Sequence, residues 1–306
     1  MEKKTVGIVG LGFMGSGIAS NLIESGYHVV CADISEDACG RVRELGGEIV
    51  SGAAQVGEKC RHILISLSSE KALRSVLNDL SETCAPGSIV IETGTFSIED
   101  KENGRELLAK KGITMLDVPL SGSNSNKNIG FNAMASGDQK AIDEISYVLD
   151  GFCRKWENVG EFGTGAKLKL VANHQTCIQA AGVAEALYFA HKLGLDLHKT
   201  VKILEQGAGS CPCLTLHGPK IARRAWEETT NRVMKNFKDQ RITCELLGNL
   251  DCPAPMYKAA VVLTKRTAEL GHEDHDRGAI FEVLERMDNE RLPLSGVDAK
   301  VDKNTI

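Results

Sequence analysis

The chain has 306 residues, of which 42% are hydrophobic, enough for one large or two modest domains with a buried core. Its formal net charge is −5 and its basic residues are dispersed, so we expect no nucleic-acid partner. No apolar run approaches the roughly eighteen residues of a membrane span, no signal peptide is recognisable, and the ten cysteines lack the paired spacing of zinc sites. We therefore expect a cytoplasmic protein that makes no membrane contact and whose thiols are reduced, Cys211 and Cys213 included.

The first half of the chain alternates β-rich runs with amphipathic, helix-like stretches that end in glycine. Strands are predicted at residues 4–10, 27–33, 62–67, 88–93 and 113–119. Strands and helices that alternate at this spacing are typical of a parallel sheet with helices on both faces. The pattern predicts an α/β fold whose N-terminal domain, residues 1–164, is a Rossmann-type, doubly wound dinucleotide-binding domain.

The strand signals stop near residue 165. Residues 166–194 carry helix-forming residues with only Gly182 as an interruption, and further helical patterns follow. We therefore predict a long connecting helix and an all-helical domain over residues 165–295 for substrate binding and self-association. The polar tail, residues 296–306, has little to bury.

A glycine pattern directly follows the first predicted strand. Gly10, Gly12 and Gly15 have the spacing G-x-G-x-x-G between a strand and a helix. Gly12 would let the backbone approach a pyrophosphate at the positive end of the helix, and Gly15 would permit close helix–strand packing. Because glycine turns also follow strands for structural reasons alone, the pattern is a weak signal until other residues support it.

Asp33 supplies such support at the end of the second predicted strand. It follows the glycine pattern by about twenty residues, the position at which an acidic group binds ribose hydroxyls. A carboxylate repels a 2′-phosphate and no arginine follows at once, so the sequence favours NAD over NADP. The structural alternative for Asp33 is a strand-end turn or a helix cap.

Two lysines, Lys167 and Lys169, stand where a glycine-rich loop enters the long predicted helix. Because positions four apart share a helical face, the face of Lys169 continues through Asn173, Thr176 and Ala180, a polar stripe suited to the wall of a cleft. Lys167 lies on another face and can extend its charge to solvent. We therefore predict Lys169 as the reactive lysine. His174 is interpreted as a packing or surface residue.

Four separated motifs resemble the β-hydroxyacid dehydrogenases, a family that includes the 3-hydroxyisobutyrate, tartronate semialdehyde and L-threonate enzymes. The motifs are GLGFMG (10–15), DVPLSGS (117–123), GTGAKLKLVAN (163–173) and FKD (237–239), and the resemblance spans nearly the whole chain. It implies an NAD-dependent oxidoreductase that acts on a small hydroxyacid or its semialdehyde or keto acid. It also implies a homodimer or homotetramer.

The resemblance assigns roles to individual residues. Lys169 is implied as the catalytic lysine, with Asn173 positioning the substrate. The substrate carboxylate would lie against Ser121 and Gly122, with Ser123 next to them. Nicotinamide-side contacts are implied for Thr95 and Lys238, and other cofactor contacts for Phe13, Met14 and Leu67.

The general chemistry is consistent with these residue types. Oxidation of an alcohol requires a group that accepts the hydroxyl proton as hydride leaves carbon, and a lysine can do this. A serine hydroxyl and backbone N–H groups can bind a carboxylate without an arginine.

The sequence departs from the family pattern at two places. Residues 123–127 are unusually polar, which indicates a substrate with more hydroxyls or charge than a plain branched acid. Glu92 and Gly94 precede Thr95 where the family usually has another acidic residue and a serine.

Two alternative functions stay open on the sequence alone. One is an imine reductase on the same scaffold, and the other is a non-catalytic dinucleotide-binding or scaffold protein. Lys169 counts against the imine reductase, and the presence of Ser121, Lys169 and Asn173 together counts against the scaffold protein.

The segment HEDHD (272–276) invites a metal-binding interpretation because His272 and His275 are three residues apart. It precedes an amphipathic helix, so Asp276 is better interpreted as a helix cap and the other residues as a solvated loop. No metal is expected.

Overall fold

The computed structural model describes residues 4–122, 130–228 and 232–290, and its chain divides into two compact units, Met1–Lys169 and Leu170–Ile306. The division falls inside the long helix α7 (Thr164–Lys192), which confirms the predicted connecting helix. The functional boundaries at residues 164 and 295 stay predictions, and the tail from residue 296 lies outside the described residues.

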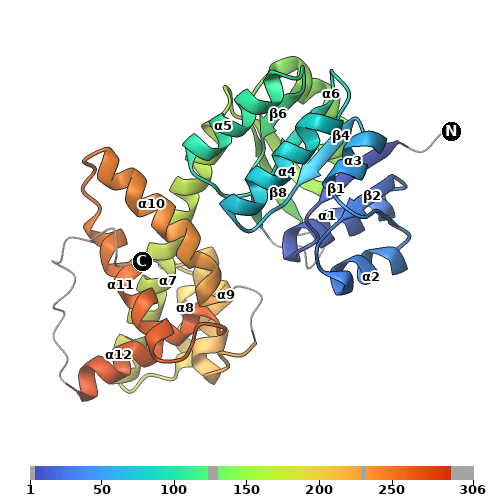
Figure 1. The fold of residues 1–306 in the computed structure, drawn as a ribbon. Coiled ribbons are helices and arrows are strands. Elements are labelled where there is room, and N and C mark those ends of the chain that lie inside the picture. The colour runs from blue at the N-terminus through green and yellow to red at the C-terminus, as the bar shows by residue number, and fades with distance from the viewer. Residues whose placement is uncertain (1–3, 123–129, 229–231, 291–306) are drawn as a thin grey trace. The chain divides into compact units, whose positions relative to one another are not determined.

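The first unit is built around a six-stranded parallel sheet in the order β3-β2-β1-β4-β5-β6 (Figure 1). This order confirms the predicted doubly wound fold. All five predicted strands are present but shorter than expected, and β3 was not predicted because it has only two residues. The strands are β1 (Thr5–Val9), β2 (His28–Ala32), β3 (Glu48–Ile49), β4 (His62–Ile65), β5 (Ile89–Glu92) and β6 (Thr114–Asp117).

Helices cover both faces of this sheet because its central strands are apolar on both sides. In β4, Leu64 packs into one core, while Ile63 and Ile65 pack into the other. The first core is closed by α1 (Phe13–Glu24), α2 (Glu36–Glu44) and α6 (Gln139–Phe152), and the second by α3 (Ala53–Lys59), α4 (Glu70–Thr83) and α5 (Ile98–Ala109).

A second, three-stranded sheet was not predicted. Its strands are β7 (Leu120–Gly122), β8 (Phe131–Ala135) and β9 (Cys153–Asn158). β7 pairs antiparallel with β8, and β8 pairs parallel with β9. β9 reads CRKWEN and four of its six residues are exposed, so it lacks the apolar run that reveals a buried strand.

The second unit is helical throughout its described part. Beyond the C-terminal part of α7, its helices are α8 (Leu197–Leu204), α9 (Pro212–Arg223), η1 (Val233–Asn236), α10 (Phe237–Asn249), α11 (Pro255–Glu269), η2 (Arg277–Ala279) and α12 (Ile280–Asn289). Two apolar clusters form its core, one around Leu187 and Phe281 and the other around Tyr257. Among the described residues, no helix is both long enough and apolar enough to cross a membrane.

Candidate active site

Two of the three glycines after β1 have a steric reason to be glycine, whereas the third, Gly12, lies in open surroundings. Gly10 has a φ of +93°, and a Cβ added there would lie 2.3 Å from the carbonyl oxygen of Ser66. A Cβ at Gly15 would lie 1.9 Å from the carbonyl oxygen of Gly10, so Gly15 allows α1 to pack directly on the loop. A Cβ at Gly12, by contrast, would meet nothing within 4 Å.

Gly12 is also the N-cap residue of α1. Its open surroundings and the lack of a capping side chain leave the positive end of α1 accessible to an anion. The site lies at the carboxyl ends of β1 and β4, where the strand order reverses and α/β sheets bind their ligands. The residues present therefore fit the pyrophosphate of a dinucleotide.

Asp33 follows β2 and is held by backbone groups on both sides. Its Oδ2 accepts a hydrogen bond from the Leu11 N–H at 2.5 Å, and its Oδ1 accepts one from the Ser35 N–H at 2.7 Å. The sequence did not predict the bond to Leu11, through which the carboxylate also fixes the glycine loop. A carboxylate has about four acceptor positions, so each oxygen retains capacity for a ribose hydroxyl.

The other predicted cofactor residues of the first unit lie on loops after strands or at the start of α1. Phe13 is 39% exposed, whereas Met14 packs partly against the first core. Leu67 follows β4 and Thr95 follows β5, and both are half-buried. These loops leave the carboxyl edge of the same sheet as the glycine pattern.

Gly94 has a steric reason that the sequence alone did not reveal. A Cβ at this position would lie 2.4 Å from the ring of Phe96 and 2.7 Å from Oε1 of Glu92. Phe96 is completely buried. With this ring in place a serine cannot stand at position 94, which explains this departure from the family pattern.

Ser121 and Gly122 lie on β7, with Ser121 half-buried and Gly122 exposed. Gly122 has a φ of +111°, and a Cβ there would lie 2.6 Å from the carbonyl oxygen of Gly130. The close pairing of β7 with β8 therefore requires glycine. Ser123 and the polar segment 123–127 lie outside the described residues.

Helix α7 separates the two lysines as their spacing predicted. Lys167 is exposed and shares its side with Val171, which is 65% exposed, whereas Lys169 is half-buried. His174 stacks on Tyr257 with ring centroids 4.6 Å apart, which confirms it as a packing residue.

Asn173 follows Lys169 by one helical turn and lies within the second unit. Its Nδ2 donates a hydrogen bond to Oδ2 of Asp239 at 2.8 Å. Asp239 belongs to the FKD motif at the start of α10, next to the half-buried Lys238. The motif thus has a second role that the sequence did not reveal, because it holds the amide of Asn173 in one orientation.

The HEDHD segment is not the simple solvated loop that we predicted. Nδ1 of His272 lies 2.7 Å from Nδ1 of His275, and its Nε2 lies 2.7 Å from Oε2 of Glu282. The side chain of His272 is only 13% exposed, so the sequence-based interpretation was wrong for this residue. Within the described ranges, no group of three or more acidic, cysteine or histidine side chains could hold a metal ion.

Asp276 caps η2, the turn that leads into α12, as predicted, by accepting the Gly278 N–H at 2.9 Å. It also lies 2.6 Å from both Nδ1 of His217 and Nζ of Lys220. Burial alone would raise the pKa of Asp276, but the hydrogen bonds and charges of His217 and Lys220 lower this pKa to about 2.

All ten cysteines fall in the described part of the chain and are free thiols there. Burial raises the pKa of Cys213 to about 11, so its thiol is protonated at neutral pH. This supports our interpretation of the pair with Cys211 as ordinary thiols.

Comparisons with known proteins found two family models that together match most of the chain. A family model described as the NAD binding domain of 6-phosphogluconate dehydrogenase matches residues 5–160. A second, described as NAD-binding of NADP-dependent 3-hydroxyisobutyrate dehydrogenase, matches residues 163–284.

Individual relatives cover nearly the whole chain. Mitochondrial 3-hydroxyisobutyrate dehydrogenase of Homo sapiens is 31% identical over 92% of this chain and 87% of its own length. Glyoxylate/succinic semialdehyde reductase 1 of Arabidopsis thaliana is 27% identical over 91% of this chain and 98% of its own length. The fold matches the crystal structure of a 3-hydroxyisobutyrate dehydrogenase from Salmonella typhimurium with a TM-score of 0.84, at 24% identity over 92% of this chain and all of that one. With a nicotinamide dinucleotide site in the first unit and matches along both units, the chain belongs to the β-hydroxyacid dehydrogenase family of oxidoreductases.

Proposed function

We propose that this protein catalyses NAD-dependent hydride transfer between a small hydroxyacid and its semialdehyde or keto acid, with Lys169 as the general acid and base. The observation that carries the proposal is the continuous helix α7, on which Lys169 and Asn173 are four residues apart. Lys169 is half-buried while its neighbour Lys167 is exposed. This contrast supports one lysine as the reagent and the other as a surface charge.

The chemistry divides between the cofactor and the chain. When bound, the nicotinamide supplies the position that accepts hydride from, or returns hydride to, the substrate carbon. Lys169 accepts the hydroxyl proton during oxidation and donates it during reduction. Asn173 holds the substrate oxygen or the lysine in register, and the hydrogen bond that its amide donates to Asp239 keeps this amide in one orientation.

We expect the substrate carboxylate to bind at the end of β7. The hydroxyl of Ser121 and backbone N–H groups near Gly122 and Ser123 offer donors for an anion. The polar composition of residues 123–127 supports a substrate that carries additional hydroxyl groups. We therefore favour a polyhydroxy acid of three to five carbons over a plain branched acid.

We propose NAD rather than NADP as the cofactor because of Asp33. Its carboxylate stands at the end of β2 and is fixed by two backbone N–H groups. A fixed negative charge at this position disfavours the 2′-phosphate of NADP.

A panel of C3–C5 hydroxyacids, assayed by NADH absorbance with NAD and NADP at equal concentrations, tests the proposal. We expect turnover with at least one acid and a preference for NAD. Reduction of cyclic imines without oxidation of any hydroxyacid would instead support an imine reductase. Dinucleotide binding without turnover on either panel would support a scaffold protein.

We also propose a cytoplasmic homodimer or homotetramer. Several large apolar side chains of the second unit are more than half exposed, among them Phe189 and Leu193 near the end of α7 and Ile203 on α8. Burial of such side chains between copies would stabilise an oligomer. Sedimentation of only a 33 kDa species at micromolar concentration would contradict the oligomer.

A further inference from the structure

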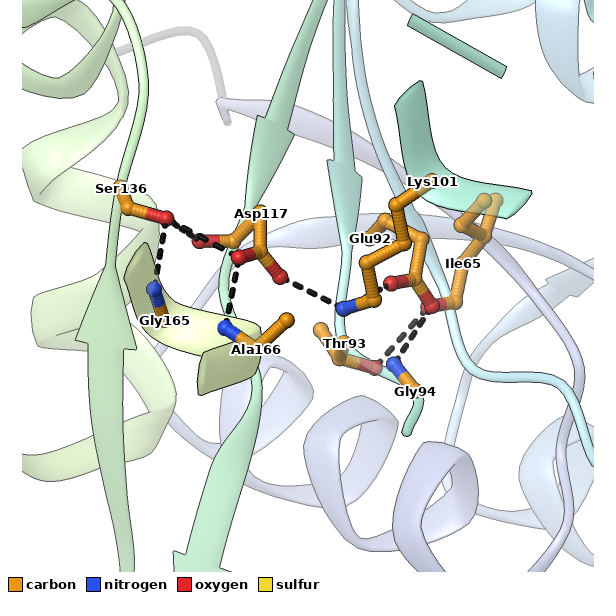
Figure 2. A network of polar contacts seen from close by, with 9 residues as sticks. All are labelled: Ile65, Glu92, Thr93, Gly94, Lys101, Asp117, Ser136, Gly165 and Ala166. Carbon is orange, nitrogen blue, oxygen red and sulfur yellow. Dashed lines mark hydrogen bonds and ion pairs between the residues drawn. The ribbon is translucent and has the colours of Figure 1, made fainter. Parts of the chain in front are cut away.

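Three charged side chains of the first unit are completely buried: Lys101 on α5, Glu92 at the end of β5 and Asp117 at the end of β6 (Figure 2). Nζ of Lys101 lies 2.5 Å from Oδ1 of Asp117 and 2.6 Å from Oε2 of Glu92. Removing such ions from water costs several kcal/mol each, and buried pairs often contribute little net stability. The cluster therefore calls for a reason other than stability alone.

One side of the cluster holds the start of helix α7. Oδ2 of Asp117 accepts the Ala166 N–H at 2.7 Å and the Ser136 hydroxyl at 3.0 Å, and Oγ of Ser136 accepts the Gly165 N–H at 3.0 Å. These two N–H groups lie in the first turn of the helix, where they have no carbonyl partner within it. The carboxylate also faces the positive end of the helix dipole. The beginning of α7 is thus fixed by side chains of β6 and of the residue after β8.

The start of α7 packs so closely against neighbouring backbone that position 165 has no room for a side chain. A Cβ at Gly165 would lie 2.6 Å from the carbonyl oxygen of Met134 and 2.8 Å from Cδ of Pro119. Lys169 follows Gly165 by about one turn, roughly 6 Å along the helix axis. A shift in the first turn of α7 would therefore move Lys169 directly.

The other side of the cluster holds the loop that carries Thr95. Oε1 of Glu92 accepts the Gly94 N–H at 2.6 Å. The N–H and the hydroxyl of Thr93 both donate to the carbonyl oxygen of Ile65, at 3.0 and 2.9 Å. One ammonium group thus contacts two carboxylates, of which one fixes the helix of Lys169 and the other the loop of Thr95.

We propose that Lys101 is a positioning residue that keeps the proton-transferring lysine in register with the cofactor-binding loop. This inference rests on the proposed function, in which Lys169 exchanges the proton, and on the nicotinamide-side contact that the family resemblance implies for Thr95. Lys101 itself touches neither substrate nor cofactor in this account. Without its ammonium group, two buried carboxylates would repel each other, and the start of α7 and the Thr95 loop would lose their common anchor.

The test compares Lys101→Met with Lys110→Met, a substitution of the exposed lysine at the C-cap of the same helix. We expect Lys101→Met to lower kcat about 10²-fold, the scale of an error of about 1 Å in placement. The dissociation constant for NAD should change less than about threefold, because the glycine loop is intact. Lys110→Met should behave as the wild type. Rates are divided by the concentration of folded enzyme, so that lost stability is not counted as lost catalysis.

A second variant decides the question if Lys101→Met does not fold. Asp117→Asn keeps the shape of the side chain, and Lys101 retains Glu92 as its partner, so this variant should fold while the link to α7 is weakened. We expect it to lower kcat at least about tenfold with unchanged NAD affinity. Wild-type kcat in either folded variant would overturn the inference. If the wild type itself oxidises no hydroxyacid, the proposed function fails instead, so the two failures can be told apart.

Discussion

Alanine should affect the stability of the protein differently at two positions of the glycine loop, Gly15 and Gly12. An added methyl group at Gly15 would lie 1.9 Å from the carbonyl oxygen of Gly10, so α1 must move. Overpacking of this kind costs about 1–3 kcal/mol, which corresponds to a fall in Tm of roughly 3–10 °C for a unit of this size. At Gly12 nothing lies within 4 Å, and Gly12→Ala should cost less than about 1 kcal/mol, the difference between glycine and alanine as an N-cap.

Cofactor binding should separate the two positions further. The methyl group of Gly12→Ala would occupy the space at the end of α1 through which a pyrophosphate approaches, so we expect NAD to bind at least about tenfold more weakly. Thermal unfolding with and without NAD measures both effects in one experiment. Gly40→Ala, at an open position within α2, serves as the control and should retain normal NAD binding. Wild-type NAD affinity in Gly12→Ala would refute the assignment of the pyrophosphate to this helix end.

Three further predictions follow from the hydrogen bonds of single carboxylates. The pKa of Asp276 is lowered to about 2 by His217 and Lys220, below the value of about 3.9 for an unfolded chain. As the pH falls from about 5 to about 2, the free energy of unfolding of the wild type should therefore fall by about 2 kcal/mol more than that of Asp276→Asn, measured by denaturant unfolding. The same pH dependence of stability in both proteins would contradict this prediction. Asp33→Ala should reduce the ratio of kcat/KM with NAD to kcat/KM with NADP, and it should also weaken NAD binding, since the N–H of Leu11 loses its acceptor. An unchanged ratio in steady-state assays would exclude Asp33 as the group that selects NAD over NADP. Asp239→Asn should raise the KM for the hydroxyacid by up to about tenfold without changing NAD affinity, because the amide of Asn173 loses a charged partner. An unchanged KM would argue against the role of Asp239 in orienting Asn173.

The fold was largely predictable because the central strands have a recognisable sequence pattern. Residues such as Ile63, Leu64 and Ile65 form short apolar runs, which are typical of strands in a sheet that is buried on both faces. The strand β9 and the two-residue β3 escaped prediction because neither contains such a run. Helix α7 was predictable from its length and the near absence of helix-breaking residues.

The roles of the candidate site residues stay predictions, whereas the contacts that connect these residues could not be predicted from the sequence. Lys101 lies in the sequence IEDKENGRE, whose charges are typical of a solvated helix face, yet its side chain is completely buried. Its burial depends on Glu92 and Asp117, which lie at the ends of β5 and β6. No local sequence pattern reveals a contact between residues so far apart along the chain. The bond between Leu11 and Asp33 was hidden for the same reason, since it joins the ends of two strands.

The central claim, that Lys169 transfers the proton while Lys167 does not, is tested most directly by comparing two variants. Lys169→Ala and Lys167→Ala are each purified, shown to be folded, loaded with NAD and assayed for NADH formation with the best hydroxyacid of the panel. We predict that Lys169→Ala loses about 10²–10⁴-fold in kcat, with NAD binding nearly intact, and that Lys167→Ala stays close to the wild type. Loss of activity in Lys167→Ala alone, or full activity in both variants, would contradict the account.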